Sequence, residues 1–254
     1  MNQKVTILSA PKRIQVWVKD ETVDLPLPIQ EQIDHYWNTV NRDQERFTRG
    51  TIYTVSRMES NPDFLNVELV KTDYAHYLYT NRKSLPEAYA CQVIYSAVML
   101  VTQDEQVLIG EMGTDTAHPG RLQFPGGSVD PRDVYGNRVD LRESVIRECR
   151  EEIGFDLKNR QLVGSFDPKY VKLGGPFRSI AVIYKANLRL TSRELQELYA
   201  KHVQSLLSAG ETPEFTSLTF VSTDPEAVRK FCREDQREKV DYLEPVLRTD
   251  AGIL

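Results

Sequence analysis

The chain has 254 residues, with 32 Lys and Arg against 37 Asp and Glu, and its formal net charge is −5. This length fits one large domain or two modest ones, and the 40% hydrophobic content is that of an ordinary globular protein. No apolar run is long enough to span a membrane, residues 1–18 lack the features of a signal peptide, and the acidic balance gives no general attraction for nucleic acid. We therefore expect neither a membrane nor a nucleic-acid partner.

The three cysteines, Cys91, Cys149 and Cys232, are odd in number and widely spaced along the chain. They form neither a disulfide framework nor a paired metal-binding motif, so they predict a reducing compartment, the cytoplasm. An anionic substrate of this acidic protein would need a metal ion or local Arg and Lys side chains to hold it.

The first third of the chain alternates short strands and helices. In chain order, the spacing of apolar residues and turn residues predicts two strands within 4–18, a helix at 29–41, a strand pair at 51–57 and 64–71, and a short helix at 73–82. A polar, proline-bearing stretch follows at 81–87. We take it as a boundary between an N-terminal α/β region, 1–87, and a second domain, 88–254.

The second region opens with a continuous apolar run at 92–101, which predicts a buried strand. A strand at 106–112, a loop bearing Pro125-Gly126-Gly127, a polar loop at 128–139 and a helix at 140–153 follow. The remaining expected elements are strands at 160–166 and 178–188, a helix at 191–208, a strand at 215–221 and a helix at 224–233. This order predicts an α+β or layered α/β fold with a mixed sheet.

The helix at 140–153 carries the most informative group of charges. Glu148, Glu151 and Glu152 are spaced so that a helix places all three carboxylates on one face. Like charges at this spacing repel each other, and a hard divalent cation such as Mg²⁺, which prefers oxygen ligands, would neutralise them. An alternative interpretation is a solvated acidic face, with Arg147 and Arg150 as ordinary surface partners.

A glycine pair precedes this helix in the sequence. Gly126 and Gly127 have no side chains, so an ion or a phosphate can approach the backbone closely there. We therefore take Gly127 as a candidate substrate contact. A glycine loop that leads to clustered carboxylates suits metal-assisted hydrolysis of a diphosphate.

These residues together resemble the sequence box of the Nudix hydrolase family, GX5EX7REUXEEXGU, in which U is a bulky aliphatic residue. The matching residues are Gly127, Arg147, Glu148, Glu151, Glu152 and Gly154. The resemblance implies an α/β/α sandwich and hydrolysis of a nucleoside diphosphate linked to another group, with Mg²⁺ or Mn²⁺. It also implies metal ligands at Glu148, Glu151, Glu152 and the carbonyl of Gly126, with one Glu orienting the attacking water and Arg147 holding the carboxylates.

The box departs from the family pattern in its middle. Arg147 follows Gly127 at a distance six residues longer than the pattern allows. Counting back from Arg147 places the middle Glu of the box on Val139, which cannot bind a metal. Asp140 and Glu143 are candidate replacements, although Asp140 equally fits the N-cap of the helix.

A second resemblance covers more of the chain, to the Nudix branch that cleaves UDP-glucose and UDP-galactose in animals. The matching segments are Leu190-Thr191-Ser192 at the start of a helix, Glu211 or Glu214 before a strand, and Phe47-Thr48-Arg49-Gly50 before another strand. This resemblance implies the products UMP and a sugar 1-phosphate, and a part for the N-terminal region in binding nucleotide or sugar. It makes Glu214 a further candidate metal ligand.

Several other side chains are candidates for substrate contact. Arg121 could meet a phosphate, and Arg178 lies at the start of a strand after a glycine loop, where a plain strand-edge charge is the alternative. His118 could donate to a phosphate, and Trp17, Trp37 and Tyr53 could stack on a base, although core packing explains these aromatic residues better.

The sequence thus predicts a metal-dependent diphosphate hydrolase, and two other functions stay open. One is a non-catalytic nucleotide-binding or sensing module, for which Val139 at the middle box position is the motive. The other is an isomerase acting on an isoprenyl diphosphate, which would use a nucleophile or acid such as Cys91.

Overall fold

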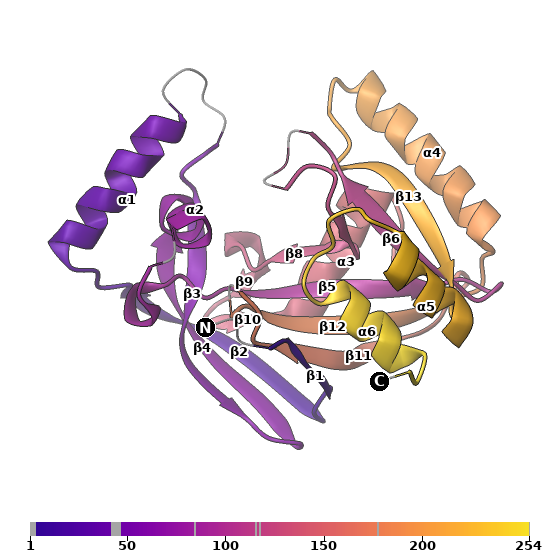
Figure 1. Cartoon of the computed structure of the whole chain (residues 1–254), viewed down its shortest axis with the longest axis horizontal. Helices are drawn as coiled ribbons and strands as arrows, with labels where there is room; N and C mark the ends of the chain where they lie inside the picture. Colours follow the sequence, from indigo (N-terminus) through magenta and orange to yellow (C-terminus); the bar gives the residue numbers. More distant parts are fainter. Residues whose placement is uncertain are drawn as a thin grey trace.

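The computed structural model describes residues 4–41, 47–83, 85–114, 116, 118–176 and 178–253. Two β-sheets form the frame of the molecule, and Figure 1 shows the smaller sheet on the left and the larger one on the right. In the described part of the chain, no helix is both long enough and apolar enough to cross a membrane.

The larger sheet is mixed, because β5 and β12 are parallel while its other pairs are antiparallel. Its main strand order is β1-β11-β12-β5-β6-β13, with β7 beside β6 and β8 beside β5. The strands are β1 (Thr6–Ser9), β5 (Ile94–Val101), β6 (Gln106–Met112), β7 (Leu122–Gln123), β8 (Gly126–Ser128), β11 (Val163–Leu173), β12 (Ile180–Leu188) and β13 (Phe215–Ser222).

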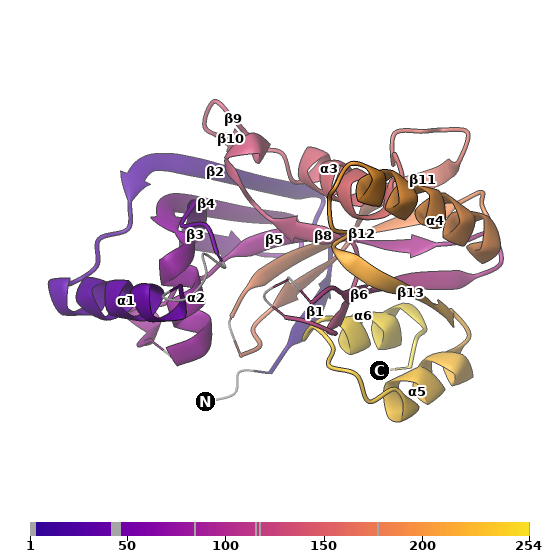
Figure 2. The same cartoon turned by 90° about the horizontal axis from the view of Figure 1, so that it is seen from above.

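Helices cover both faces of this sheet. Helices α3 (Leu141–Ile153) and α4 (Ser192–Ser208) lie on one face, and α5 (Pro225–Glu234) and α6 (Leu243–Asp250) lie on the other, as Figure 2 shows. Each face has its own hydrophobic core, one containing residues of α3 and α4 and one containing residues of α6. This three-layer arrangement is the α/β/α sandwich that the sequence predicts.

The smaller sheet has the strand order β3-β4-β2-β10-β9. Its strands are β2 (Arg13–Thr22), β3 (Thr51–Ser60), β4 (Phe64–Asp73), β9 (Val134–Tyr135) and β10 (Arg138–Val139). Helices α1 (Leu27–Val40) and α2 (Tyr74–Lys83) belong to the same region and contact each other, and single 3₁₀ turns occupy Glu87–Tyr89 and Pro131–Asp133. Buried residues of this sheet, such as Leu65 and Val67, share one core with α3, so the two sheets are packed into one body.

The polar loop expected at 128–139 is instead largely structured. After the 3₁₀ turn, β9 and β10 form a hairpin whose turn contains Gly136 at a φ of 65°, a conformation that favours glycine. Strand β10 pairs with β2, and the Val18 N–H donates to the Asn137 carbonyl at 2.9 Å. A segment from the middle of the box therefore extends the sheet built by the N-terminal region.

Helix α3 begins and ends where the sequence predicts. The Asp140 carboxylate accepts hydrogen bonds from the backbone N–H groups of Arg142 and Glu143, both at 3.0 Å, and so caps the helix. Gly154 ends it in the left-handed conformation, with a φ of 74°. Both ends of helix α3 are thereby fixed, and with them the positions of its side chains relative to the sheet.

Candidate functional site

The three carboxylates of α3 lie side by side but differ in their exposure. Glu152 is only 2% exposed, and the side chains of Glu148 and Glu151 are 13% and 47% exposed. The helix contacts β5 and β8, so its buried carboxylates face the backbone of the glycine pair. The structure therefore brings together the candidates that the sequence singled out at this point.

Both glycines are required by close contacts. The Gly126 N–H donates to Glu152 Oε2 at 2.7 Å, and a Cβ at Gly126 would lie 2.2 Å from the Ser96 carbonyl oxygen of the neighbouring strand. A Cβ at Gly127 would lie 2.5 Å from Glu148 Oε1. The absence of side chains at these two positions lets the backbone and the carboxylates approach each other.

Burial and mutual repulsion make it costly for these carboxylates to be ionised at the same time. Burial, opposed by Arg147 and reinforced by neighbouring carboxylates, raises the pKa of Glu148 to about 7. Burial and the charges of Glu214 and Glu148 raise the pKa of Glu152 well above its ordinary value, and burial followed by Glu151 raises the pKa of Glu214. A cation among these groups would reverse this penalty.

One oxygen atom of this group is free to take a ligand. Glu152 Oε1 is buried and has no hydrogen-bond partner among the residues that the structure describes. A buried carboxylate oxygen without a partner is costly, and hard divalent cations such as Mg²⁺ or Mn²⁺ bind such oxygens. The donor set of Glu148, Glu152 and Glu214 thus fits a divalent ion.

The carboxylates must still move to surround an ion. Within the described ranges, no three His, Cys, Asp or Glu side chains are already grouped as a set that could hold a metal. Glu148 Oε1 instead lies 2.8 Å from Arg147 Nη2, and the exposed Glu151 pairs with Arg147 Nη1 at 3.0 Å. Metal binding would therefore turn Glu148 away from this arginine.

Arg147 is the centre of the ionic network beside the glycine pair. Its guanidinium donates to Asp133 at 3.1 Å, in addition to its contacts with Glu148 and Glu151. Burial alone would lower the pKa of Arg147, but Glu148 and Asp133 raise it, so the guanidinium stays charged. Arg147 thus contacts two of the carboxylates that the sequence singled out, Glu148 and Glu151.

Asp133 corrects the expectation about Val139. Asp133 is 2% exposed, pairs with Arg147 and accepts a hydrogen bond from Ser144 Oγ at 3.0 Å. It is the sixth residue after Gly127, the spacing of the middle Glu in the family box, whereas Val139 lies in the hairpin. The six additional residues therefore follow the middle acid, and counting forward from Gly127 would have found it.

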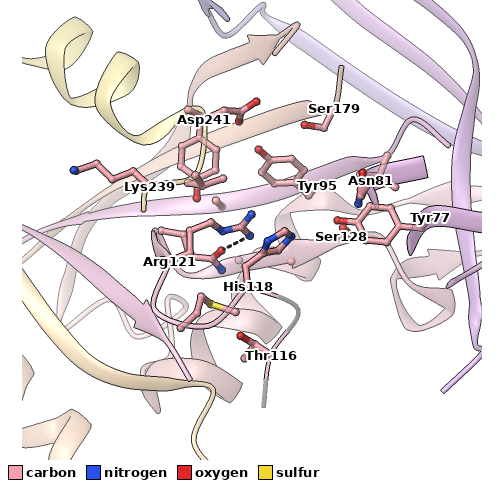
Figure 3. Close-up of a pocket in the computed structure, with 18 of the residues that line it drawn as sticks. Tyr77, Asn81, Tyr95, Thr116, His118, Arg121, Ser128, Ser179, Lys239 and Asp241 are labelled. Carbon is pink, nitrogen blue, oxygen red and sulfur yellow. Dashed lines mark hydrogen bonds between the residues drawn. The ribbon is translucent and has the colours of Figure 1, made fainter. Parts of the chain in front are cut away.

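A cavity of about 600 Å³ opens beside this group. Gly126, Gly127 and Glu214 line it, together with Tyr74, Tyr77 and Asn81 of α2. Figure 3 shows His118 between Arg121 on one side and Tyr77 on the other, with Tyr95 and Ser179 near them. The cavity thus lies between the N-terminal helix α2 and the larger sheet.

The basic side chains of the cavity differ in their charge and in their hydrogen bonds. Arg121 Nη2 donates to Gln123 Oε1 at 3.1 Å, while its buried Nε–H has no partner within the described residues. Burial and the charge of Arg121 lower the pKa of His118 to about 4, so its ring is neutral at pH 7. Lys239, the other basic side chain of the cavity, is paired with Asp235 and Glu244, so Arg121 has the donor that is left for an anion.

Other candidates lie elsewhere. Arg178 pairs with Glu87 and is absent from the described residues that line the cavity, and Glu211 is exposed. Tyr53 is buried in the core, Trp37 packs edge-on against Tyr74, and the half-buried Trp17 lies on β2, so none of the three reaches this cavity. Burial raises the pKa of Cys91 to about 12, which leaves the thiol unsuited to act as a nucleophile.

Similarities to solved structures are weak. A structure of DR0079 from Deinococcus radiodurans has a TM-score of 0.43 and 18% sequence identity, and the match covers 62% of this chain and 82% of that one. The bifunctional NMN adenylyltransferase/ADP ribose pyrophosphatase of Francisella tularensis gives a TM-score of 0.41 and 12% identity, over 69% of this chain and 45% of that one.

A sequence relative gives a local match. The human mitochondrial coenzyme A diphosphatase NUDT8 is 29% identical over 94 residues, which are 35% of this chain and 38% of the relative. The match thus spans less than half the length of this relative. The sequence model of the NUDIX domain matches residues 93–237, more than half of the chain, and includes the glycine pair and the whole of α3. The chain therefore belongs to the Nudix hydrolase family.

Proposed function

We propose that this protein hydrolyses a nucleoside diphosphate linked to another group, with a divalent metal ion. The observation that carries the proposal is the buried, unpartnered Glu152 Oε1 among carboxylates with raised pKa values. Glu152 is hydrogen-bonded to Gly126, which lines a cavity together with Glu214 and Arg121. Glu148, Glu151, Glu152, Glu214 and the Gly126 carbonyl would hold the ion. Bound there, the ion would act as a Lewis acid on a phosphate oxygen and lower the pKa of water.

The chain's own groups have distinct tasks in this proposal. Arg121 binds the diphosphate through its free Nε–H, and Gly127 leaves room for the phosphates beside Glu148. One of Glu148, Glu151 and Glu152 would orient the attacking water. Arg147 keeps the carboxylates in place through Asp133.

The leading substrate is a nucleotide sugar, UDP-glucose or UDP-galactose, cleaved to UMP and sugar 1-phosphate. Support comes from the sequence resemblance and from a cavity lined by the glycine pair, Glu214 and several tyrosines. Coenzyme A is the second candidate, because the relative NUDT8 is named a coenzyme A diphosphatase. The sensing-module alternative is based on Val139 at the middle acid position of the box. It is not favoured, because Asp133 occupies that position.

The compartment remains an expectation. Cys91, Cys149 and Cys232 are all free thiols, which supports the reducing cytoplasm inferred from the sequence.

A product assay tests the function. Purified protein with Mg²⁺ or Mn²⁺ is incubated with UDP-glucose, UDP-galactose, ADP-ribose and coenzyme A, and the products are separated. We expect UMP from the UDP-sugars. Cleavage of another compound would discard the nucleotide sugar, and no metal-dependent product from any of them would contradict the hydrolase.

Substitution of Glu152 by Gln tests the carboxylate group. The side chain keeps its shape and can still accept from the Gly126 N–H, but it loses the charge that binds the ion. We expect turnover to fall by about a hundredfold or more, with a melting temperature equal to or above that of the wild type because repulsion with Glu214 is relieved. The exposed Glu197→Gln on α4 is the control, and near-wild-type turnover of Glu152→Gln would contradict the site.

A further inference from the structure

The cavity has a wall that lies outside the segment matched by the family model. Helix α2, at residues 74–83, supplies Tyr74, Tyr77 and Asn81 to a cavity that is also lined by the glycine pair, which lies within the matched segment 93–237. Figure 3 shows Tyr77 and Asn81 together on one side of the cavity, across from Arg121. A ligand held at Arg121 can therefore extend toward α2.

Asn81 has a hydrogen-bonding capacity that the protein does not use. Its Oδ1 is buried and has no hydrogen-bond partner in the described part of the chain. The amide is hydrogen-bonded to the Tyr77 side chain, an interaction that opposes the burial that raises the pKa of Tyr77. A buried acceptor left unpaired costs free energy, so this oxygen is suited to a ligand N–H.

The surroundings of Asn81 fit a flat aromatic ring. Tyr74, Tyr77 and Tyr95 line the same cavity and offer aromatic surface to stack on a base. Among the bases, uracil and guanine present a ring N–H at the centre of their hydrogen-bonding edge, whereas adenine and cytosine have an acceptor nitrogen there and donate only through an exocyclic amino group. Uracil, as a single ring, needs less of the 600 Å³ that the whole substrate must share.

We propose that Asn81 of helix α2 is a specificity-determining residue that reads the base, with Oδ1 accepting the N3–H of uracil while Arg121 holds the diphosphate. This inference rests on the proposed function in that it assigns the base of the same substrate. It gives the N-terminal region a defined task, the selection of uridine nucleotides, and leaves the chemistry to α3 and the glycine pair.

Nucleotide binding without metal tests this independently of turnover. The affinities of UMP, CMP, AMP and GMP are measured by calorimetry for the wild type, Asn81→Ala and Asn81→Leu. The Leu variant keeps the branched outline of Asn, with somewhat more volume, so it removes the hydrogen bond without leaving a cavity. We expect the wild type to prefer UMP, and both variants to lose about tenfold in UMP affinity with less than about threefold change for AMP and CMP.

Asn66→Ala is the matched control. Asn66 on β4 also has a buried Oδ1 without a partner in the described residues, but it lies outside this cavity. We expect this variant to keep both the affinity and the preference of the wild type. Melting temperatures of all variants separate a change in recognition from a change in folding.

Three results would overturn the inference: a wild type without preference for UMP, a wild type that binds none of the four nucleotides, or an unchanged preference in both Asn81 variants. Failure of the proposed function has a different signature. If UMP preference depends on Asn81 but no diphosphate is cleaved, the base assignment stands and the hydrolase fails. If UDP-, CDP- and ADP-sugars are cleaved equally well by the wild type and the Asn81 variants, the hydrolase stands and the base assignment fails.

Discussion

Arg147 connects two acidic groups that have different tasks. On one side it pairs with Asp133, which is buried and receives a second hydrogen bond from Ser144. On the other side it pairs with Glu148 and Glu151, the carboxylates offered to a metal ion. If Glu148 were to hold an ion, Asp133 would still pair with the guanidinium of Arg147.

We therefore expect the removal of Asp133 to lower the stability of the fold. Asp133→Ala leaves Arg147 and Ser144 without their shared acceptor, and we expect a loss of about 3 kcal/mol in the free energy of unfolding, measured with urea. Asp156→Ala, which removes the exposed partner of Arg150, is the control and should cost less than about 1 kcal/mol. Equal losses in the two variants would show that the Asp133 pair has no special weight.

The neutral His118 makes stability depend on pH. Burial and Arg121 lower its pKa to about 4 in the folded protein, below the ordinary value of 6.5, so the unfolded chain binds more protons between these values. Stability is therefore lost as the pH falls from about 6.5 toward 4. In urea titrations across this range, His118→Gln should lessen the loss by about 1–2 kcal/mol, allowing for solvent near the ring.

The exposed His35→Gln on α1 is the comparison for this measurement, and we expect it to leave the pH dependence unchanged. The interpretation of His118 is wrong if its variant follows the wild-type curve at every pH.

Residue spacing predicted one half of the site and missed the other. The helical spacing of Glu148, Glu151 and Glu152 depends on local geometry alone, and Asp133 could have been found by counting forward from Gly127. Asn81 could not be found from the sequence, because it belongs to no motif and its Oδ1 is buried at a cavity only in the folded chain. Arg178 illustrates the opposite error, since a position after a glycine loop does not say that Glu87 will pair with it.

Among the elements, the β9–β10 hairpin has the clearest effect on architecture. It adds two strands beside β2 of the smaller sheet, and the chain continues from its second strand directly into α3. The Asp140 N–H donates to the Asp133 carbonyl at 3.1 Å, so the residues that flank the hairpin are already adjacent. The insertion thereby joins the two sheets without displacing the cap of α3.

Excision of residues 134–139 tests this division. It leaves seven residues between Asp133 and Arg147, the spacing of the family box, and removes the bond from the Val18 N–H to Asn137. We expect turnover to stay within about tenfold of the wild type, while stability falls by about 1–2 kcal/mol and amide exchange in β2 accelerates. Lost turnover with unchanged exchange in β2 would assign the hairpin to the catalytic site instead.

Most elements follow from local signals, and the exceptions have physical causes. Thr191 and Glu194 form the predicted capping box of α4, and every predicted strand and helix has a counterpart in the structure. Helix α6 is missed because Pro245 lies within it and its start at Tyr242 has no side-chain cap. The hairpin is missed because its strands have only two residues each, and their pairing with β2 is set by tertiary contact.

At the scale of the molecule, the cavity couples the two parts of the chain. A division near residue 87 remains our proposal for the organisation of the chain, yet the cavity takes side chains from both sides of it. Binding of one nucleotide should therefore protect both parts at once.

Hydrogen exchange measures this coupling. With UMP bound, we expect slower amide exchange in α2, at 74–83, and in the loop at 118–123, by about threefold or more. Helix α5 lies away from the cavity and serves as the reference that should not change. Protection confined to the loop would mean that α2 does not take part in binding.

Strand β1 has a consequence for the order in which the molecule folds. Residues 6–9 pair with residues 170–173, about 160 positions later, and only after β1 does the chain build the smaller sheet. Closing so long a loop is entropically slow, and the partner strand is synthesised long after β1. Strand β1 is synthesised before the smaller sheet, and that sheet is itself incomplete until residues 134–139 are made. We therefore expect β1 to pair late, so that its contacts with β11 and α6 are added to an already folded sandwich.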